Sequence, residues 1–267
     1  MLFQLVGNLR AFPQPDFNLR SKGRAFMKIR SLHCVALLLL LAASFSYAQR
    51  RPATATTTSG KFALDGGWTL QSSSKVEQSG EVLSQPAFQP KGWYSTTVPT
   101  TVVASLVKHK VLPDPNFGMN LRQFPGVSYP IGANFSNVPM PPDSPYLVSW
   151  WYRKAFLLPA DYRGKSVWLN FKGINYRANI WLNGKQIANS DQVAGAWRTY
   201  EFNVTQDAKP GAENVVAVQV FAPTENDLAI TFVDWNPAPP DKNMGLWREV
   251  FLSSSGPVHG AAQECQR

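Results

Sequence analysis

Apolar and polar residues alternate most regularly between residues 171 and 187. Apolar side chains take every second position from Ala178 to Leu182, the period at which residues of a β-strand share one face. The pair Asn183-Gly184 follows, and these residue types suit the two left-handed positions of a type I′ turn. We therefore predict an antiparallel hairpin with one buried face, in which Ile180 lies opposite Ile187.

The same alternation recurs through the second half of the chain, and turn residues at 161–165 and 209–213 separate the segments. A further alternating segment around Asp65-Gly66-Gly67 predicts an opening hairpin that places Trp68 in the core. Many short strands with little helical periodicity predict an all-β fold, a β-sandwich. The other strands are expected at 146–157, 167–171, 197–204, 214–221, 229–232 and 246–252.

One short helix is predicted at 101–107, where apolar residues follow helical spacing and Thr100 or Thr101 can cap the first turn. The prolines of residues 112–120 exclude both a helix and a central strand. Residues 121–145 are rich in Pro, Gly and Asn, and a loop of this length is usually functional or disordered. Three aromatic side chains in this loop favour an ordered one, namely Phe124, Tyr129 and Phe135.

The beginning of the chain has the composition of an export signal. Residues 27–48 combine a basic start, an apolar stretch too short to cross a bilayer and a small-residue end, so we predict cleavage after Ala48. Residues 1–26 are interpreted as an upstream extension and residues 49–60 as a flexible linker, because neither has an apolar pattern. We therefore expect an exported protein, periplasmic or extracellular, without a membrane anchor in its mature form.

The charge and the cysteine content argue against several classes of function and of stabilising bond. The whole chain carries a net charge of +9, but the residues after Ala48 hold 20 basic and 16 acidic residues, a net charge of +4. These basic residues are scattered, which argues against a nucleic-acid partner. Only Cys265 remains after Ala48, so no internal disulfide can form, and three widely spaced histidines suggest no metal site. We expect no cofactor.

Nine tryptophans suggest carbohydrate binding, because an indole ring stacks on the C–H face of a pyranose. Most are better explained as core residues, and we predict this role for Trp68, Trp168, Trp181 and Trp247. Trp235 differs because it lies in the polar, proline-rich loop 233–245. The Asp and Asn residues of this loop could bind sugar hydroxyls or could merely cap turns.

Catalysis by this chain alone is not expected. Glycoside hydrolysis needs two carboxylates at a fixed separation, and Asp234 and Asp241 are the only plausible pair in one loop. We expect this loop to face solvent, where neither apolar burial nor a rigid separation is available.

Several motifs together resemble the N-terminal sugar-binding domain of glycoside hydrolase family 2, and more narrowly its exo-β-D-glucosaminidase and β-mannosidase-like branch. The resemblance covers residues 61–258 in the order of the family. The motifs are Asp65-Gly66-Gly67-Trp68, Val98-Pro99-Thr100-Thr101-Val102, residues 113–120 (PDPNFGMN), residues 143–146 (DSPY), residues 150–153 (WWYR), residues 173–184 (GINYRANIWLNG) and residues 243–250 (NMGLWREV).

The resemblance implies a jelly-roll β-sandwich, galactose-binding-domain-like, that precedes an immunoglobulin-like domain and a catalytic barrel in the complete enzymes. In relatives, the second domain begins at the position that corresponds to residue 259. In this chain residues 259–267 follow instead, and we interpret them as a disordered tail. The Asn-Glu dipeptide that marks the family's acid does not occur in this sequence. A truncated gene, or an incomplete record of one, is the interpretation that this suggests.

The resemblance also implies substrate-binding residues. A Tyr-Pro-Ile stretch followed by Asn places the first at Asn134, and the second falls on Asp234 or Asp241. The loop that borders the terminal-sugar pocket in glucosaminidase-like relatives adds three weaker candidates, Trp235, Asn236 and Asn243. A carboxylate there would suit the ammonium group of an amino sugar.

The leading hypothesis is thus the non-catalytic sugar-binding domain of an exported, exo-acting β-glycosidase that hydrolyses β-glucosaminide or β-mannoside bonds. Its partner would be a terminal β-linked sugar. The alternatives are a free-standing carbohydrate-binding module and a structural sandwich without a ligand.

Overall fold

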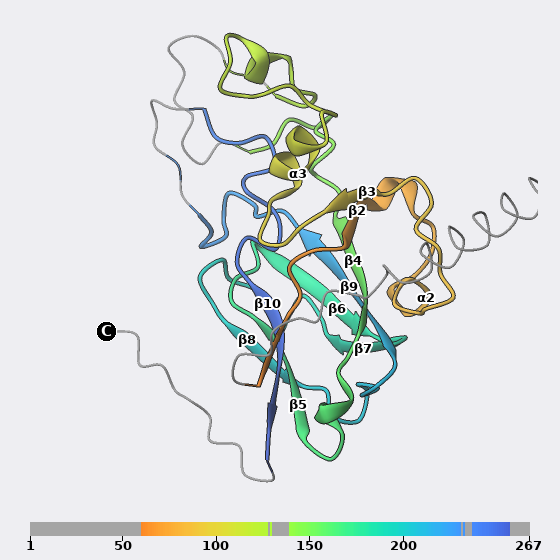
Figure 1. The fold of residues 1–267 in the computed structure, drawn as a ribbon. Coiled ribbons are helices and arrows are strands. Elements are labelled where there is room, and N and C mark those ends of the chain that lie inside the picture. The colour runs from red at the N-terminus through yellow and green to blue at the C-terminus, as the bar shows by residue number, and fades with distance from the viewer. Residues whose placement is uncertain (1–59, 128, 130–138, 231, 233–236, 257–267) are drawn as a thin grey trace, which may run out of the picture. The chain divides into compact units, whose positions relative to one another are not determined.

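Figure 1 shows the computed structural model of the chain, which describes residues 60–127, 129, 139–230, 232 and 237–256. No described helix is both long and apolar enough to cross a membrane. Several predicted segments lie outside the described residues. They are the extension 1–26, the signal 27–48, the tail 259–267 and all of the linker 49–60 except Gly60.

The structure contains ten strands and a few short helices in its described part. The strands are β1 (Lys61–Ala63), β2 (Trp68–Ser72), β3 (Tyr94–Thr96), β4 (Trp150–Leu157), β5 (Ser166–Phe171), β6 (Arg177–Leu182), β7 (Lys185–Ala188), β8 (Tyr200–Asn203), β9 (Glu213–Phe221) and β10 (Val250–Ser255). The helices are α2 (Gly80–Leu83) and α3 (Val102–Lys108), and three 3₁₀ turns are η1 (Ser73–Lys75), η2 (Asn120–Gln123) and η3 (Ala160–Tyr162).

The strands form two antiparallel sheets that pack face to face. One sheet has four strands in the order β1-β10-β5-β8, and the other has six in the order β3-β2-β4-β9-β6-β7. Alternate side chains of both sheets enter one core, where they are shielded from water. The predicted all-β sandwich is confirmed. The fully buried members of this core include Trp68, Leu70, Tyr152, Leu169, Phe171, Ile180, Leu182, Val216, Val218 and Leu252.

The hairpin formed by β6 and β7 confirms the predicted turn but not the predicted pairing. Asn183 and Gly184 have φ angles of 52° and 90°, as a type I′ turn requires. Ile180 pairs with Ala188 while Trp181 pairs with Gln186, so β7 carries one extra residue. The predicted position of Ile180 opposite Ile187 is wrong because this β-bulge shifts the register by one residue.

The outer face of the six-stranded sheet is also covered, so the expectation of one buried face is wrong here. Trp151 and Trp181 lie on this face with their ring centroids 5.3 Å apart. Leu83 of the single-turn helix α2 belongs to the same buried cluster as both rings. A Cβ atom on Gly80 would lie 2.3 Å from the Trp181 ring, so α2 can approach the sheet only because residue 80 is glycine.

The predicted opening hairpin is wrong. β1 pairs with β10 and β2 pairs with β3 and β4, so residues 64–67 carry the chain from one sheet to the other. Leu64 is fully buried on this crossing, and its carbonyl accepts a hydrogen bond from Nε1 of Trp68 at 2.5 Å. Trp68 and Trp181 are core residues as predicted, whereas Trp168 and Trp247 are only half-buried. Trp168 lies on the outer face of β5, whose inner face carries Val167 and Leu169.

Three other predicted strands are present with different bounds, because β4 begins at Trp150 and not at 146, β8 spans Tyr200–Asn203 and not 197–204, and β10 spans Val250–Ser255 and not 246–252. The predicted helix is present. α3 begins directly after Thr101, whose hydroxyl accepts from the backbone N–H of Ala104 at 3.2 Å and so caps the helix. The strand expected at 229–232 is absent from its described residues, because Ala229, Ile230 and Phe232 pair with no other strand. Of these residues, Phe232 lines the cleft described below.

Candidate functional site

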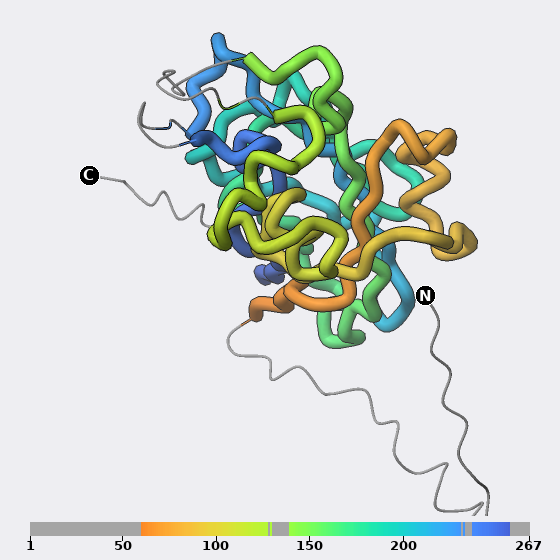
Figure 2. Tube along the Cα trace, turned by 90° about the horizontal axis from the view of Figure 1, so that it is seen from above, coloured from red at the N-terminus to blue at the C-terminus, as the bar shows by residue number. Residues whose placement is uncertain are grey.

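Three segments converge beyond one end of the sandwich, where Figures 1 and 2 show them side by side. They are α3, the loop after it, and the segment that precedes β10. Between them lies a cleft of about 820 Å³, which we call the loop-end cleft. Its described lining comprises Thr101, Val103, Ala104, Val107, Lys108, Asp114, Pro115, Asn116, Leu121, Phe232, Pro237, Pro239, Pro240, Asp241 and Asn243.

Asp241 fastens the base of the cleft. Its Oδ2 accepts from the backbone N–H of Val103 at 2.8 Å, and its Oδ1 accepts from the backbone N–H of Asn243 at 3.0 Å. Val103 is the second residue of α3, so the carboxylate satisfies an N–H group that the helix itself leaves free. The side chain is fully buried, which contradicts the solvent-facing position expected from the sequence.

Burial disfavours the charged form of this carboxyl and raises the pKa of Asp241 from 3.8 to about 6. The hydrogen bonds from Val103 and Asn243 act in the opposite direction and keep the shift from being larger. Both oxygens accept from backbone N–H groups and the side chain is fully buried, so Asp241 acts as an anchor of the cleft.

Asn175, just before β6, holds the segment 242–245 from the other side. Its Nδ2 donates to the carbonyls of Lys242 and Asn243, both at 2.9 Å. Its backbone N–H donates to Gly245 O at 3.0 Å and its carbonyl accepts from Gly245 N at 2.8 Å. Asn175 belongs to the motif 173–184, which continues into the β6–β7 hairpin. This motif therefore fixes the shape of segment 242–245, although the hairpin's turn at Asn183-Gly184 lies elsewhere.

The backbone of the same segment needs unusual angles. Lys242 and Asn243 have positive φ angles of 48° and 58°, and Gly245 has a φ of 152°. The same segment is also hydrogen-bonded to α3, because Val102 N donates to Met244 O at 2.9 Å. Segment 242–245, α3 and Asn175 are therefore held together at the base of the cleft, and we call this arrangement the rigid joint.

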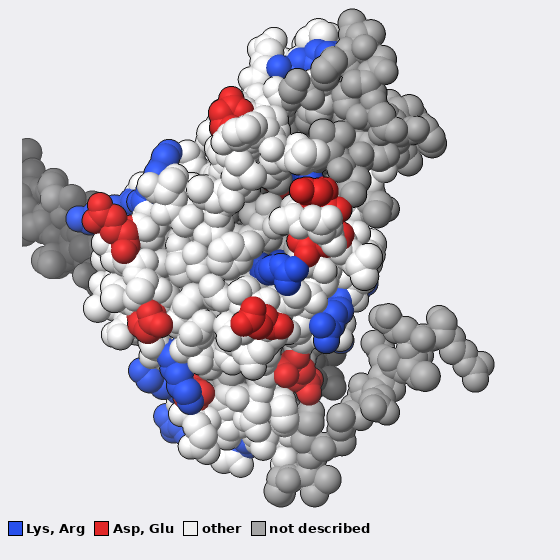
Figure 3. Space-filling model, turned by 180° about the vertical axis from the view of Figure 1, so that it is seen from behind, with Lys and Arg blue, Asp and Glu red and all other residues white. Residues whose placement is uncertain are grey.

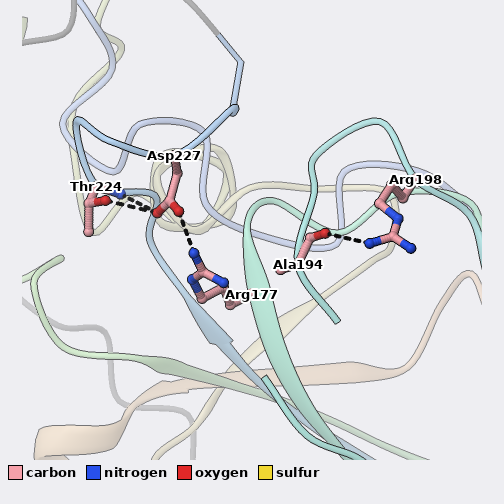
Figure 4. A network of polar contacts seen from close by, with 5 residues as sticks. All are labelled: Arg177, Ala194, Arg198, Thr224 and Asp227. Carbon is pink, nitrogen blue, oxygen red and sulfur yellow. Dashed lines mark hydrogen bonds and ion pairs between the residues drawn. The ribbon is translucent and has the colours of Figure 1, made fainter. Parts of the chain in front are cut away.

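A polar network fixes the segment that leads into the cleft from β9 (Figure 4). Arg177 donates to Oδ1 of Asp227 at 2.5 Å, and Oδ2 of Asp227 accepts from the backbone N–H and hydroxyl of Thr224 at 2.9 and 3.0 Å. Burial raises the pKa of Asp227, but the hydrogen bonds from Thr224 and Arg177 outweigh it and leave the pKa below its usual value. In the same view, Arg198 donates to Ala194 O at 3.4 Å.

The open side of the cleft carries the polar groups that remain available to a ligand. Asp114 and Asn116 are exposed, and Oδ1 of Asp114 accepts from the backbone N and the Nδ2 of Asn116 at 2.9 and 3.2 Å. Within the described part of the chain, the second carboxylate oxygen of Asp114 accepts no hydrogen bond. Tyr129 closes the region by donating to Ala238 O at 2.6 Å, and burial raises the pKa of Tyr129 to about 12. A carboxylate and an amide beside apolar walls can accept from and donate to sugar hydroxyls.

The structure describes two of the six predicted site residues. Asp241 and Asn243 both border the cleft, whereas Asn134, Asp234, Trp235 and Asn236 lie outside the described residues. Sequence reasoning missed Asp114, Asn116 and Asn175 as site residues. The Pro-Asp-Pro-Asn run was a signal for the first two, but nothing in the sequence linked Asn175 to residues 70 positions later. Within the described part of the chain, no three His, Cys, Asp or Glu residues are grouped to hold a metal ion.

On the face shown in Figure 3, acidic and basic side chains alternate across wide uncharged areas and form no single-sign patch.

Comparison with known proteins identifies what this fold is similar to. Residues 146–232 match the family model described as glycosyl hydrolase 2 galactose-binding domain-like. The chain is 34% identical over 209 residues to an exo-β-D-glucosaminidase of Streptomyces avermitilis, covering 78% of this chain and 21% of that protein. It is 30% identical over 223 residues to a mannosylglycoprotein endo-β-mannosidase of Lilium longiflorum, covering 74% of this chain and 22% of that protein.

A solved structure agrees with these relatives. The exo-chitosanase of Amycolatopsis orientalis superposes with a TM-score of 0.62 at 29% identity, covering 73% of this chain and 21% of that one. The chain thus spans about a fifth of the length of these three proteins. The resemblance found in the sequence motifs is confirmed.

Proposed function

Because this chain carries the galactose-binding domain-like fold of glycosyl hydrolase family 2, we propose that it binds a terminal β-linked sugar in the loop-end cleft. The observation that carries the proposal is the cleft itself, a space of about 820 Å³ lined by two carboxylates, exposed Asp114 and buried Asp241, and by the amides of Asn116 and Asn243. Clefts of this volume, with apolar walls and a few fixed polar groups, are typical of small-molecule sites. The joint formed by Asp241, Asn175 and Gly245 holds the border in place before a ligand arrives.

The sugar we propose is a β-linked glucosamine, with β-linked mannose as the second choice. An ammonium group at physiological pH forms a strong charge-assisted hydrogen bond with a carboxylate, and Asp114 offers an exposed one. The names of the relatives support this choice, since two are glucosaminidase or chitosanase enzymes and one is a mannosidase. In this proposal the domain contributes binding, and the catalytic carboxylates belong to a barrel domain of the complete, exo-acting enzyme.

Calorimetric titration with glucosamine oligomers and with manno-oligosaccharides tests the binding site. Removing both Asp114 and Asn116 (Asp114→Ala with Asn116→Ala) is expected to weaken glucosamine binding by about tenfold or more, because each charge-assisted hydrogen bond contributes roughly 1.5–3 kcal/mol. Asn189 and Asp191 form a similar exposed pair, with Asp191 N donating to Asn189 Oδ1 at 3.1 Å. The variant Asn189→Ala with Asp191→Ala is therefore the matched control and is expected to bind as the parent does.

The alternatives give different results in the same experiment. A structural sandwich predicts no heat with any sugar, and a site elsewhere predicts equal binding by both variants. A free-standing carbohydrate-binding module predicts the same heats as our proposal, but its gene would lack a downstream frame encoding a barrel. Release of sugar from an aryl β-glycoside by the purified chain, clearly above buffer, would contradict the non-catalytic role.

We further propose that the protein is exported by means of residues 27–48. Expression of the full chain in a host with a secretion system is expected to yield a mature form that begins at Gln49, since Ala48 ends the small-residue cleavage motif. N-terminal sequencing of the secreted protein checks this. A protein that stays in the cytoplasm with its apolar stretch intact would contradict the proposal.

A further inference from the structure

A second depression lies at the outer side of the four-stranded sheet and shares no described lining residue with the loop-end cleft. Its volume is about 790 Å³. We call it the cation–aromatic groove, because three basic and two aromatic side chains dominate its surface. Its described lining comprises Lys61, Pro99, Lys172, Thr199, Trp247, Arg248, Glu249 and Phe251.

The aromatic wall of the groove is held rigidly. Nε1 of Trp247 donates to Ala196 O at 2.9 Å, which fixes the indole in one orientation. A Cβ on Gly173 would lie 2.8 Å from Nε1 of Trp247 and 2.9 Å from the Arg248 side chain, so these two side chains pack directly on the Gly173 backbone. The guanidinium of Arg248 lies 5.5 Å from the Trp247 ring, within range of a cation–π contact.

A second indole extends this wall into solvent. Trp197 meets Trp247 edge to face, with ring centroids 4.8 Å apart and planes at 85°. It is nevertheless 59% exposed, although an indole is among the most costly side chains to leave in water. An exposed indole supported by a fixed one is a suitable platform for the C–H face of a pyranose ring.

The charges around the groove are unbalanced. Glu249 is the only acidic residue in the described lining, and its carboxylate is paired with Lys61 at 2.7 Å. Lys61 also lies 4.1 Å from the centroid of the Phe251 ring, so its position is set by two contacts. Lys172 and Arg248 form no ion pair with a carboxylate of the described residues. Two positive charges therefore remain to attract an anion.

We propose that the cation–aromatic groove binds an acidic sugar, a pyranose that bears a carboxylate. The indole of Trp197 would receive the C–H face of the ring, while Arg248 and Lys172 would bind the carboxylate. A guanidinium matches a carboxylate with two parallel hydrogen bonds, which gives the groove its selectivity. A glucosamine chain carries ammonium groups, which the same two cations repel. The two depressions thus select sugars of opposite charge.

Calorimetric titration of the full chain with a trimer of galacturonic acid tests this site, with neutral galactose and glucosamine trimers as comparison ligands. Binding of the uronate alone is expected, and it weakens as salt is added because the attraction is largely ionic. The variant Lys172→Gln with Arg248→Gln is expected to lose tenfold or more in affinity, and Trp197→Ala to lose a similar factor.

Matched controls lie on other parts of the surface. Lys75→Gln with Lys91→Gln removes two positive charges elsewhere, and Phe117→Ala removes an aromatic side chain that is 75% exposed. Both are expected to bind the uronate as the parent does.

Three results would overturn the proposal. They are equal binding of the galactose trimer, unchanged affinity in the Lys172 and Arg248 variant, and no binding of the uronate at all. Glucosamine binding in the loop-end cleft is measured separately, so either site can fail without the other.

Discussion

Replacing Gly245 with alanine is expected to lower the free energy of unfolding by roughly 2–6 kcal/mol. A Cβ at this position would lie 2.6 Å from the carbonyl oxygen of Thr100 and 2.6 Å from the hydroxyl of Tyr152. The first of these atoms belongs to the backbone and cannot rotate away. Overpacking of this kind costs about 1–3 kcal/mol. The φ of 152°, which an alanine rarely adopts, adds a cost of similar size.

Gly66→Ala is the control, because a Cβ on Gly66 would meet no atom within 4 Å. Urea unfolding of the two variants, followed by tryptophan fluorescence, compares them directly. The Gly66 variant is expected to unfold close to the parent and the Gly245 variant at a much lower denaturant concentration. Equal stability of the two would show that the chain can move away from α3 at residue 245, and the rigid joint at the base of the cleft would not exist.

The second large effect is a dependence of stability on pH that comes from Asp241. Its pKa is about 6 in the folded chain and close to 3.8 when the chain is unfolded. Between these values the folded state binds more protons than the unfolded state, so the free energy of unfolding falls as the pH rises through this window. The total contribution is about 3 kcal/mol, since one unit of pKa corresponds to about 1.4 kcal/mol. The full contribution is present below about pH 4 and is lost above about pH 6.

Asp241→Asn isolates this contribution because the amide does not titrate. Urea unfolding of both proteins at several values between pH 3.5 and pH 7.5 gives the difference in stability as a function of pH. Relative to the asparagine variant, the parent is expected to become less stable by about 3 kcal/mol as the pH rises. A difference that does not change with pH would show that Asp241 is as well solvated in the folded chain as in the unfolded one and would contradict its burial. A parent that gains stability relative to the variant would show that its hydrogen bonds outweigh burial and that the pKa of Asp241 is lowered.

Local sequence patterns were enough to predict the fold class and several elements. Alternation of apolar residues gave the sandwich, helical spacing gave the position of α3, and the residue types of Asn183-Gly184 gave the turn. These patterns missed helix α2, since one turn of helix is too short to show a period. They also missed the bulge in β7, because the pattern of one strand does not determine how its partner aligns.

The site was less predictable, for a related reason. Loop 233–245 attracted notice through its Asp, Asn and Trp residues, and two of them, Asp241 and Asn243, line the loop-end cleft. Whether Asp241 faces solvent or α3 depends on contacts with residues more than 130 positions away, such as Val103. The role of Asn175 is likewise set by a bridge to Gly245. Such long-range contacts leave no local signature in a single sequence.

The central claim is that the loop-end cleft binds a sugar, and amide chemical-shift mapping by NMR during titration with a glucosamine oligomer tests it most directly. The predicted result is that the largest shifts occur at Asp114, Asn116 and Asn243, while amides of β5 and β8 stay unchanged. Shifts that instead gather on the four-stranded sheet, or no shifts at saturating sugar, would contradict it.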